Sequence, residues 1–479
     1  MTVLQETVNV SRTVEEAFAY VSDFTTTAEW DSTVLTARKL TPGAIGVGTK
    51  FEVVCALPVG SVTLVYTVET LQPNEFIELK GRSKFFDVKD SISFSRSDTG
   101  TRIDYRAEFE FKPLVSRVAA LAKSGLEKMG RESVAGLGAA LDDNFPLRET
   151  SRLNQTADRL VLPGVSLFSR LGYKLGRKRF NPMSASVKNR HMLITGASSG
   201  LGYTAALELA RRGAELTLVI RDRHKAEKTI AELQRETGNS NIHFELADLS
   251  LMADVDALVA RMKKRGKPLD VLINNAGALF NPRTETAEGL EQSFALLLLS
   301  PYRLTEGLKP LLSRADSPRV INVVSGGMYS QTLQVDALLN ADAKAYSGSA
   351  AYAREKRALM VVTEEWARKW AEEGIVVNAM HPGWADTPGV RSALPQFRRL
   401  TRSILRSAEE GADTIVWLAV ATEAGKVSGK LFLDREVRPT YLLKNTRESR
   451  QERDKLLNFL EAYKFTNGRA RRASASAAP

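Results

Sequence analysis

The chain has 479 residues, 43% of them hydrophobic and 26% charged, which is typical of an ordinary soluble protein with two or three domains. Its only cysteine, Cys55, excludes a disulfide framework and favours a reducing, cytoplasmic compartment. The net charge of +11 comes with no helix-turn-helix, no zinc pattern and no basic stretch with interleaved aromatic residues, so no nucleic-acid binding is expected.

Residues 1–145 have the pattern of a β-rich domain that ends in a long helix. The segment TVLQETVNV alternates as a strand does, and VEEAFAYVSDF then places apolar residues at helical spacing. Strand-like segments separated by turns such as QPNE and SDTG follow, as in antiparallel hairpins, and residues 114–143 have a helical period. This order predicts an α+β domain in which a curved sheet holds a helix and can enclose an apolar ligand.

Residues 146–188 differ from both neighbours, because they are basic, contain LPG and NP breakers and keep no period. We interpret them as a linker with one or two short amphipathic helices around VSLFSRLGYKLGRK. Solvation explains the basic side chains most simply, and peripheral contact of this basic linker with an anionic membrane is the alternative. The longest apolar run, FALLLL, is far shorter than the ~20 residues of a membrane span, and we expect no signal peptide.

Residues 189–445 alternate short apolar runs, such as MLIT, ELTLVI and DVLIN, with amphipathic helices. That alternation predicts an α/β domain with a doubly wound parallel sheet of the Rossmann type. Residues 446–479 are expected to form a C-terminal helix and a disordered tail, which ends in GRARRASASAAP.

The first βα unit of this α/β domain carries a phosphate-binding pattern. In MLITGASSGLGYTAALELA, Gly196, Gly200 and Gly202 stand between a strand and a helix, where glycines let backbone N–H groups approach a pyrophosphate. The next strand ends at Arg221, which would accept the 2′-phosphate of NADP, and Asp222 follows, which would pair with the ribose of NAD. No acidic residue precedes Arg221, so NADP is favoured and NAD is the alternative.

The segment SAAYAREKRAL places Tyr352 and Lys356 four residues apart, on one face of a helix. A free tyrosine has a pKa near ~10, too high for efficient proton exchange at neutral pH. A nearby lysine ammonium would lower that pKa, and Tyr352 would then act as the general acid in reduction or as the base in oxidation. Alone, this spacing is common on solvated helices, so its meaning depends on the motifs around it.

Those motifs are TGASSGLG, ADL, NNAG, the serine of NVVSGG, YAREK and HPGWADT, which occur in this order over about 250 residues. Together they resemble the short-chain dehydrogenase/reductase family, and most of all its branch around dehydrogenase/reductase member 12, close to retinol-dehydrogenase-like enzymes. The resemblance implies hydride transfer between a nicotinamide cofactor and a carbonyl or alcohol.

The resemblance also implies roles for particular residues. Ser325 would bind the substrate oxygen, Tyr352 would transfer the proton, and Lys356 would hold the nicotinamide ribose. The implied cofactor-binding set consists of Gly196, Ser198, Ser199, Gly200, Leu201, Gly202, Arg221, Asp248, Leu249, Asn275, Ala276, Gly277, Tyr352, Lys356, Pro382, Gly383 and Thr387.

Some positions keep a second interpretation. Asp248 can cap the following helix instead of contacting adenine, and Thr387 can be an ordinary loop residue. His381 is expected to be structural. Leu297 stands where the family usually has an asparagine that anchors a water of the proton relay, and leucine cannot hydrogen-bond. A cofactor-sensing, lipid-binding protein with little turnover is therefore the alternative to a working oxidoreductase.

The segment VSRTVEEAFAYVSDFTTTAEWDSTV, with Trp30 after its helix, resembles the START-like, polyketide cyclase-like SRPBCC superfamily. The resemblance implies a helix-grip domain that binds a lipid-, polyketide- or steroid-like molecule, with Trp30 as a core or lid anchor. A cyclase or lyase reaction in this domain is a further alternative, but no cluster of histidines and acids that would support it is visible. The substrate is expected to be a small hydrophobic carbonyl or alcohol compound. No metal ion is expected to take part in the reaction, and the family resemblance implies that the chain could form a homodimer.

Overall fold

A computed structural model describes the chain as two compact units, which consist of Met1–Pro146 with Arg177–Ala185 and of Leu147–Gly176 with Ser186–Pro479. The described residues are 2–31, 33–56, 61–112, 123–142, 147, 150, 167–177, 180–181, 183, 187–339, 344–387, 391, 398–399, 401–442 and 446–464.

The described strands of the first unit form one antiparallel sheet. They are β1 (Thr2–Val10), β2 (Val34–Lys39), β3 (Lys50–Ala56), β4 (Ser61–Gln72), β5 (Phe76–Arg82), β6 (Phe86–Ser97) and β7 (Gly100–Phe111). The order across the sheet is β1-β7-β6-β5-β4-β3-β2. The chain thus pairs its first strand with its last, and the predicted α+β class is confirmed.

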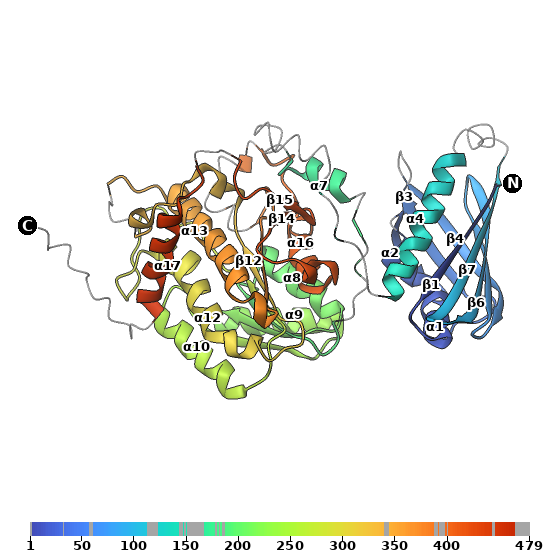
Figure 1. Cartoon of the computed structure of the whole chain (residues 1–479), viewed down its shortest axis with the longest axis horizontal. Coiled ribbons are helices and arrows are strands. Elements are labelled where there is room, and N and C mark those ends of the chain that lie inside the picture. Colours follow the sequence, from blue (N-terminus) through green and yellow to red (C-terminus); the bar gives the residue numbers. More distant parts are fainter. Residues whose placement is uncertain are drawn as a thin grey trace, which may run out of the picture. The chain divides into compact units, whose positions relative to one another are not determined.

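Among the residues that the structure describes, three helices accompany this sheet, α1 (Val14–Ser22), α2 (Thr27–Trp30) and α4 (Lys123–Leu141). A capping box starts α1, since the Thr13 hydroxyl accepts from the Glu16 N–H and the Glu16 carboxylate accepts from the Thr13 N–H. Helix α4 lies along β1 (Figure 1) and buries Leu137 in the core. Only glycine fits at Gly136, because a Cβ there would come within 2.1 Å of the Trp30 carbonyl oxygen. The predicted helix over 114–143 is described from Lys123, and its first residues lie outside the described part.

The second unit contains a sheet that is parallel except at one edge. Its strands are β8 (His191–Thr195), β9 (Glu215–Ile220), β10 (Ile242–Leu246), β11 (Val271–Asn274), β12 (Arg319–Val323), β13 (Val376–Met380), β14 (Leu431–Leu433) and β15 (Glu436–Arg438). The order is β10-β9-β8-β11-β12-β13-β14-β15, and only the last pair is antiparallel. The order reverses between β8 and β11, which is where a doubly wound sheet opens a ligand crevice. The predicted Rossmann class is confirmed.

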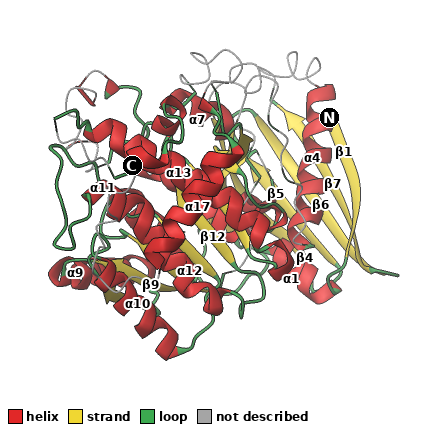
Figure 2. Cartoon of the chain, turned by 60° about the vertical axis from the view of Figure 1, so that its left-hand side comes forward, coloured by secondary structure: helices red, strands yellow, loops and turns green. Residues whose placement is uncertain are grey.

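Helices cover both faces of this sheet. They are α8 (Gly200–Arg211), α9 (Arg223–Thr237), α10 (Met252–Arg265), α11 (Gln292–Phe294), α12 (Ser300–Leu312), α13 (Gly348–Lys369), α16 (Ala408–Val420) and α17 (Arg450–Lys464), with a π-helical turn at Ala295–Leu299. Helix α8 contacts α9 and α16, whereas α10 contacts α12, and α13 contacts α17. Figure 2 shows α12 and α13 lying over β12. The predicted C-terminal helix is thus α17, which buries Leu456 and Leu460, and residues 465–479 lie outside the described part.

The segment predicted as a linker divides between the two units. Its described residues before Arg177 group with the second unit, where α7 (Arg170–Arg177) forms, and those from 177 to 185 group with the first. The reason is a set of hydrogen bonds and ring contacts made by residues 167–170, described below. Across the residues the structure describes, no helix has the length and apolarity of a membrane span.

Candidate active site

The residues predicted to bind cofactor and to catalyse proton transfer lie around one cleft at the carboxyl ends of the parallel strands. The cleft has a volume of about 650 Å³. From the predicted set it is lined by Gly196, Ser198, Ser199, Gly200, Leu201, Arg221, Asp248, Leu249, Asn275, Ala276, Gly277, Ser325, Tyr352, Lys356, Pro382, Gly383 and Thr387. Gly202 is absent from this lining and lies behind it, in the first turn of α8.

The turn after β8 has the backbone that its glycines predict. Gly196 and Gly200 have φ angles of 67° and 57°, a left-handed conformation that side-chain-bearing residues rarely adopt. A Cβ at Gly202 would come within 2.4 Å of both the Gly196 carbonyl oxygen and the Asn275 side-chain nitrogen. Asn275 in turn donates through Nδ2 to the carbonyl oxygens of Thr195 (2.9 Å) and Gly196 (3.2 Å). Asn275 therefore holds the turn in shape from the neighbouring strand.

Arg221 and Asp222, at the end of β9, have different surroundings. The Arg221 side chain is 70% exposed, lines the cleft and lies 3.4 Å from the Asp248 carboxylate, measured from Nη1 to Oδ2. The Asp222 carboxylate instead accepts a hydrogen bond of 2.8 Å from the Lys225 N–H and caps α9. The rival acid is therefore engaged in helix capping and is not in the wall of the cleft.

Asp248 does not cap the helix that follows it, contrary to its alternative interpretation. Its Oδ1 accepts from the N–H and the hydroxyl of Ser250, at 3.0 and 2.7 Å. The first N–H groups of α10, those of Met252 and Ala253, donate to the carboxylate of Glu288 at 2.6 and 2.8 Å. Asp248 thus remains part of the cleft wall, and the Glu288 carboxylate accepts from the first N–H groups of α10.

Tyr352 and Lys356 project from the first turns of α13 into the same cleft. The Lys356 side chain is buried, and its Nζ donates to the Val323 carbonyl oxygen at 2.7 Å and lies 5.8 Å from the centre of the Tyr352 ring. Burial lowers the pKa of Lys356 to about 8 and raises the pKa of Tyr352 to about 12. The expected lowering of the tyrosine pKa is therefore not found, because burial disfavours the phenolate and the Lys356 ammonium points to a backbone carbonyl.

Ser325 follows β12 and starts a short 3₁₀ turn, Gly326–Ser330. Its Oγ accepts a hydrogen bond of 3.2 Å from the Gly327 N–H, and the residue lines the cleft with Tyr352. His381, at the end of β13, is fully buried, and burial holds its pKa well below the ordinary value. Thr387 lies at the cleft edge, where its N–H donates to the Ala385 carbonyl oxygen at 3.1 Å.

Comparison with known proteins agrees with this geometry. Residues 190–396 match the family model of the short chain dehydrogenases. Dehydrogenase/reductase SDR family member 12 from Bos taurus is 43% identical over 302 residues, which cover 62% of this chain and 94% of that protein. This chain belongs to the short-chain dehydrogenase/reductase family. The human member 12 is 41% identical with the same coverage, and human retinol dehydrogenase 13 is 32% identical over 52% of this chain and 78% of that protein.

As a member of the short-chain dehydrogenase/reductase family, the chain is an oxidoreductase. Among solved structures, L-sorbose reductase from Gluconobacter frateurii in complex with NADPH and L-sorbose is 24% identical, with a TM-score of 0.44, and the match covers 53% of this chain and 98% of that one.

Leu297, the residue expected to replace an asparagine of the short-chain dehydrogenase/reductase pattern, lies close to Lys356. It is fully buried in the π-helical turn Ala295–Leu299. A Cβ built on Gly277 would lie 3.2 Å from the Leu297 side chain and 3.8 Å from Lys356 Nζ, so leucine and ammonium border the same small space. Leucine offers no hydrogen-bond acceptor, and the Lys356 Nζ donates to the Val323 carbonyl oxygen.

Residues 1–142 match the family model for polyketide cyclase / dehydrase and lipid transport, which confirms the second resemblance. Trp30 is 2% exposed there and packs its ring 6.3 Å from that of Tyr105. The sequence alone does not show which polar residues lie near Trp30, because the polar residues of this domain come from separate strands.

The interior of this domain contains a polar cluster. Asp90, on β6, is 3% exposed, and burial raises its pKa to about 7, an effect that interactions with the Tyr66 and Tyr105 hydroxyls partly offset. Burial raises the pKa of both tyrosines well above the usual range. Asp31, which accepts from the Thr33 N–H and hydroxyl at 2.8 and 2.7 Å, adds a second carboxyl. The cluster thus joins two carboxyls to two tyrosine hydroxyls, and the expected lack of a histidine and acid set for independent chemistry stays a prediction.

Proposed function

We propose that the second unit is an NADP(H)-dependent oxidoreductase that acts on the carbonyl or alcohol group of a hydrophobic substrate. The observation that carries this proposal is the presence of Ser325, Tyr352 and Lys356 in the same cleft as the glycine turn after β8. The nicotinamide cofactor, when bound, supplies or accepts the hydride. The protein's own side chains carry out proton transfer, orient the substrate and select the cofactor.

Tyr352 has the properties of a general acid for carbonyl reduction. Its raised pKa, about 12, keeps the phenol protonated at neutral pH, so it can donate to the substrate oxygen. Ser325 accepts from the Gly327 N–H and can donate its own proton to the same oxygen. A Lys356 ammonium, held in place through the Val323 carbonyl, would stabilise the phenolate that remains after proton transfer.

The cleft fits NADP in two respects. The turn at Gly196 and Gly200 has the left-handed backbone that lets N–H groups face a pyrophosphate at the start of α8. Arg221 presents an exposed guanidinium, which suits a 2′-phosphate, whereas Asp222 is engaged by the Lys225 N–H. These contacts support NADP over NAD.

Apolar walls support a hydrophobic substrate. Beyond the residues discussed above, the cleft is bordered by Leu279, Phe280, Leu296 and Trp384, which offer large apolar surfaces. Such a wall with a small set of polar groups suits an apolar compound that carries one reactive oxygen.

The proposal is tested by titrating the protein with NADPH and NADH and by measuring NADPH oxidation with apolar ketones. We expect NADPH to bind more tightly, and Tyr352→Phe to lose ~100-fold or more of the turnover with an unchanged NADPH affinity. Tyr302→Phe is the matched control, since Tyr302, on α12, is not part of the cleft lining and its hydroxyl donates to the Glu461 carboxylate at 2.8 Å. If wild-type protein binds NADPH but turns over none of the ketones, the cofactor-sensing alternative suggested by Leu297 is favoured.

For the first unit, we propose binding of an apolar ligand that carries a hydroxyl or carbonyl oxygen, and the buried cluster around Asp90 favours it. A carboxyl in an apolar interior is costly unless polar groups accompany it, and here Tyr66 and Tyr105 do so. The test compares binding of 2-naphthol with that of 2-methylnaphthalene. The double variant Tyr66→Phe, Tyr105→Phe should weaken 2-naphthol binding alone, and equal effects on both compounds would contradict a polar recognition site.

A further inference from the structure

Phe168, from the segment that precedes the Rossmann sequence, lies in the wall of the cleft. It is 4% exposed, and its ring lies 4.6 Å from that of His381 and 6.3 Å from that of Trp384, both edge-on. A Cβ built on Gly326 would come within 2.8 Å of the Phe168 ring, so the ring fills the space beside the residue that follows Ser325. A residue outside the dinucleotide-binding fold is thus placed next to the proposed catalytic serine.

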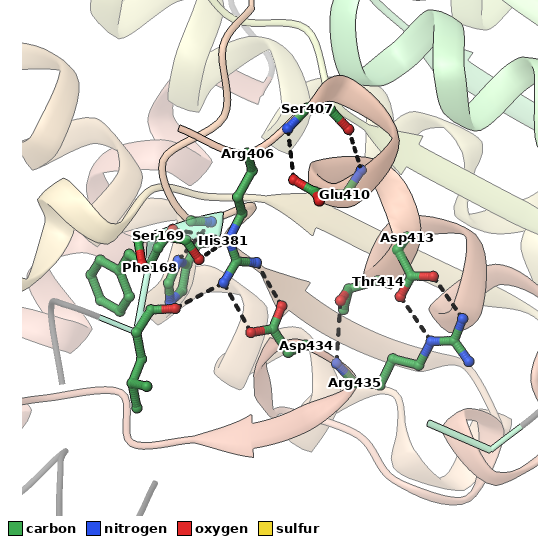
Figure 3. Close-up of polar contacts among 12 residues, drawn as sticks. Phe168, Ser169, His381, Arg406, Ser407, Glu410, Asp413, Thr414, Asp434 and Arg435 are labelled. Atoms are coloured by element: carbon green, nitrogen blue, oxygen red, sulfur yellow. Dashed lines mark hydrogen bonds and ion pairs between the residues drawn. The ribbon is translucent and has the colours of Figure 1, made fainter. Parts of the chain in front are cut away.

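Arg406 fixes the backbone around Phe168 (Figure 3). Its Nε donates to the carbonyl oxygens of Phe168 (2.9 Å) and Ser169 (3.2 Å), and its Nη2 donates to that of Leu167 (2.9 Å). The same guanidinium forms a two-pronged ion pair with Asp434, at 2.6 and 2.9 Å. The Arg406 side chain is 1% exposed, and its guanidinium carbon also lies 5.6 Å from the centre of the Tyr173 ring, so buried partners determine its orientation.

Neighbouring groups complete the attachment of this segment. The Trp384 N–H donates to the Phe168 carbonyl oxygen at 2.8 Å, and the Arg170 N–H donates to the Ile404 carbonyl oxygen at 2.8 Å. Gly383 has a φ of 67°, and a Cβ there would come within 2.5 Å of the Phe168 carbonyl oxygen. The loop after β13 therefore accommodates the segment closely, which a loosely attached linker would not require.

We propose, on the basis of the proposed reductase function, that Phe168 determines substrate specificity by contacting the apolar part of the carbonyl substrate, and that Arg406 positions it. A buried guanidinium that satisfies three carbonyl groups is a costly way to hold a segment that only needs to cover a core. Such a guanidinium is suited to holding one aromatic ring at a defined place in a cleft. The wall that contacts substrate is then completed by the chain that connects the two units.

The first test is Phe168→Leu, with Phe432→Leu as the matched control. Phe432 is fully buried in the same unit and packs on Trp417, away from the cleft lining. The ratio of kcat/KM for 2-acetylnaphthalene to that for butan-2-one, with NADPH, should fall about 10-fold in Phe168→Leu through KM, because part of an apolar contact is lost. NADPH affinity should stay within about 2-fold of wild type, and the control should keep the wild-type ratio. Phe168→Met is the second variant if Phe168→Leu fails to fold.

The second test replaces the anchor. Arg406→Lys loses the two-pronged geometry while keeping the charge. Arg435→Lys is its control, because Arg435 forms a similar ion pair with Asp413 (Figure 3), and among the described residues this pair contacts none of the residues 167–169. We expect Arg406→Lys to raise KM for 2-acetylnaphthalene about 5-fold or more with a smaller change in kcat, and Arg435→Lys to leave KM unchanged. A merely structural role of Arg406 would lower both variants' melting temperatures without this split.

Equilibrium binding of 2-acetylnaphthalene to the NADP⁺ complex separates the failure of this proposal from that of the proposed function. If wild type binds the ketone without turnover, the reductase proposal fails, but weaker binding by Phe168→Leu still supports the role of Phe168. If wild type turns the ketone over, and Phe168→Leu has the wild-type affinity for the ketone and the wild-type ratio of the two kcat/KM values, the role of Phe168 is refuted. If wild type does not bind the ketone, the assignment of an apolar subsite at Phe168 is overturned as well.

Discussion

Replacing Lys356 with methionine should make the second unit more stable at neutral pH. Burial lowers the pKa of Lys356 from 10.5 to about 8, and at ~1.4 kcal/mol per pKa unit the charged ammonium destabilises the folded chain by roughly 3 kcal/mol at pH 7. Methionine has a similar length and removes this penalty, but it also removes the hydrogen bond to the Val323 carbonyl, worth about 1 kcal/mol. The expected net gain in the free energy of unfolding is about 2 kcal/mol.

The pH dependence gives this prediction its sign. Below pH 8 the ammonium is charged in both the folded and the unfolded chain, so the penalty is constant. Between pH 8 and 10.5 only the unfolded chain keeps the proton, so the wild-type fold gains stability as the pH rises. At pH 9.5 the advantage of Lys356→Met should therefore have shrunk by about 2 kcal/mol, to near zero.

The assay is urea unfolding of the nucleotide-free protein at pH 7 and 9.5, followed by fluorescence. Lys369→Met, at the exposed end of the same helix, is the control and should change the free energy of unfolding by less than ~0.5 kcal/mol. A Lys356→Met protein that is less stable at pH 7, or whose advantage does not depend on pH, would refute the desolvation argument. Loss of turnover in the same variant would show that stability and catalysis make opposite demands on this position.

Three further predictions concern other side chains. Arg221→Ala should weaken NADPH binding about 10-fold relative to NADH, since a charge-assisted contact to the 2′-phosphate is lost; an unchanged ratio in parallel titrations would argue against it. Asp222→Ala should lower the free energy of unfolding by about 1 kcal/mol through loss of the α9 cap, with no change in cofactor preference. The pKa of Asp90 is raised from 3.8 to about 7, so Asp90→Asn should stabilise the first unit by up to about 4 kcal/mol at pH 7.5, and the gain should vanish near pH 4 in thermal melts.

Much of the fold and of the cofactor site could be predicted from the sequence, because local rules govern them. Glycines at 196, 200 and 202 between a strand and a helix predict the phosphate turn, and the left-handed φ angles of Gly196 and Gly200 agree with that prediction. A spacing of four residues puts Tyr352 and Lys356 on one helix face whatever the rest of the chain does. The order of the motifs then indicates which strand ends meet at the cleft.

Other features could not be predicted from the sequence, because they depend on which side chains bury one another in the folded chain. The pattern cannot show that burial raises the pKa of Tyr352, or that Lys356 donates to a strand carbonyl. The sequence favours Arg221 over Asp222 only through their order, and the structure adds that the Asp222 carboxylate accepts the capping hydrogen bond from the Lys225 N–H.

By itself, the sequence determined the two domain classes, the family, and the identity of the proposed catalytic residues. Only the tertiary structure decided that Phe168 belongs to the cleft and that Asp90 meets Tyr66 and Tyr105. The physical reason is one of range, since dihedral preference and helical spacing act over a few residues. Burial, ion pairing and ring packing instead join residues as distant as Leu167 and Arg406, and these contacts exist only once the sheet and its helices have assembled.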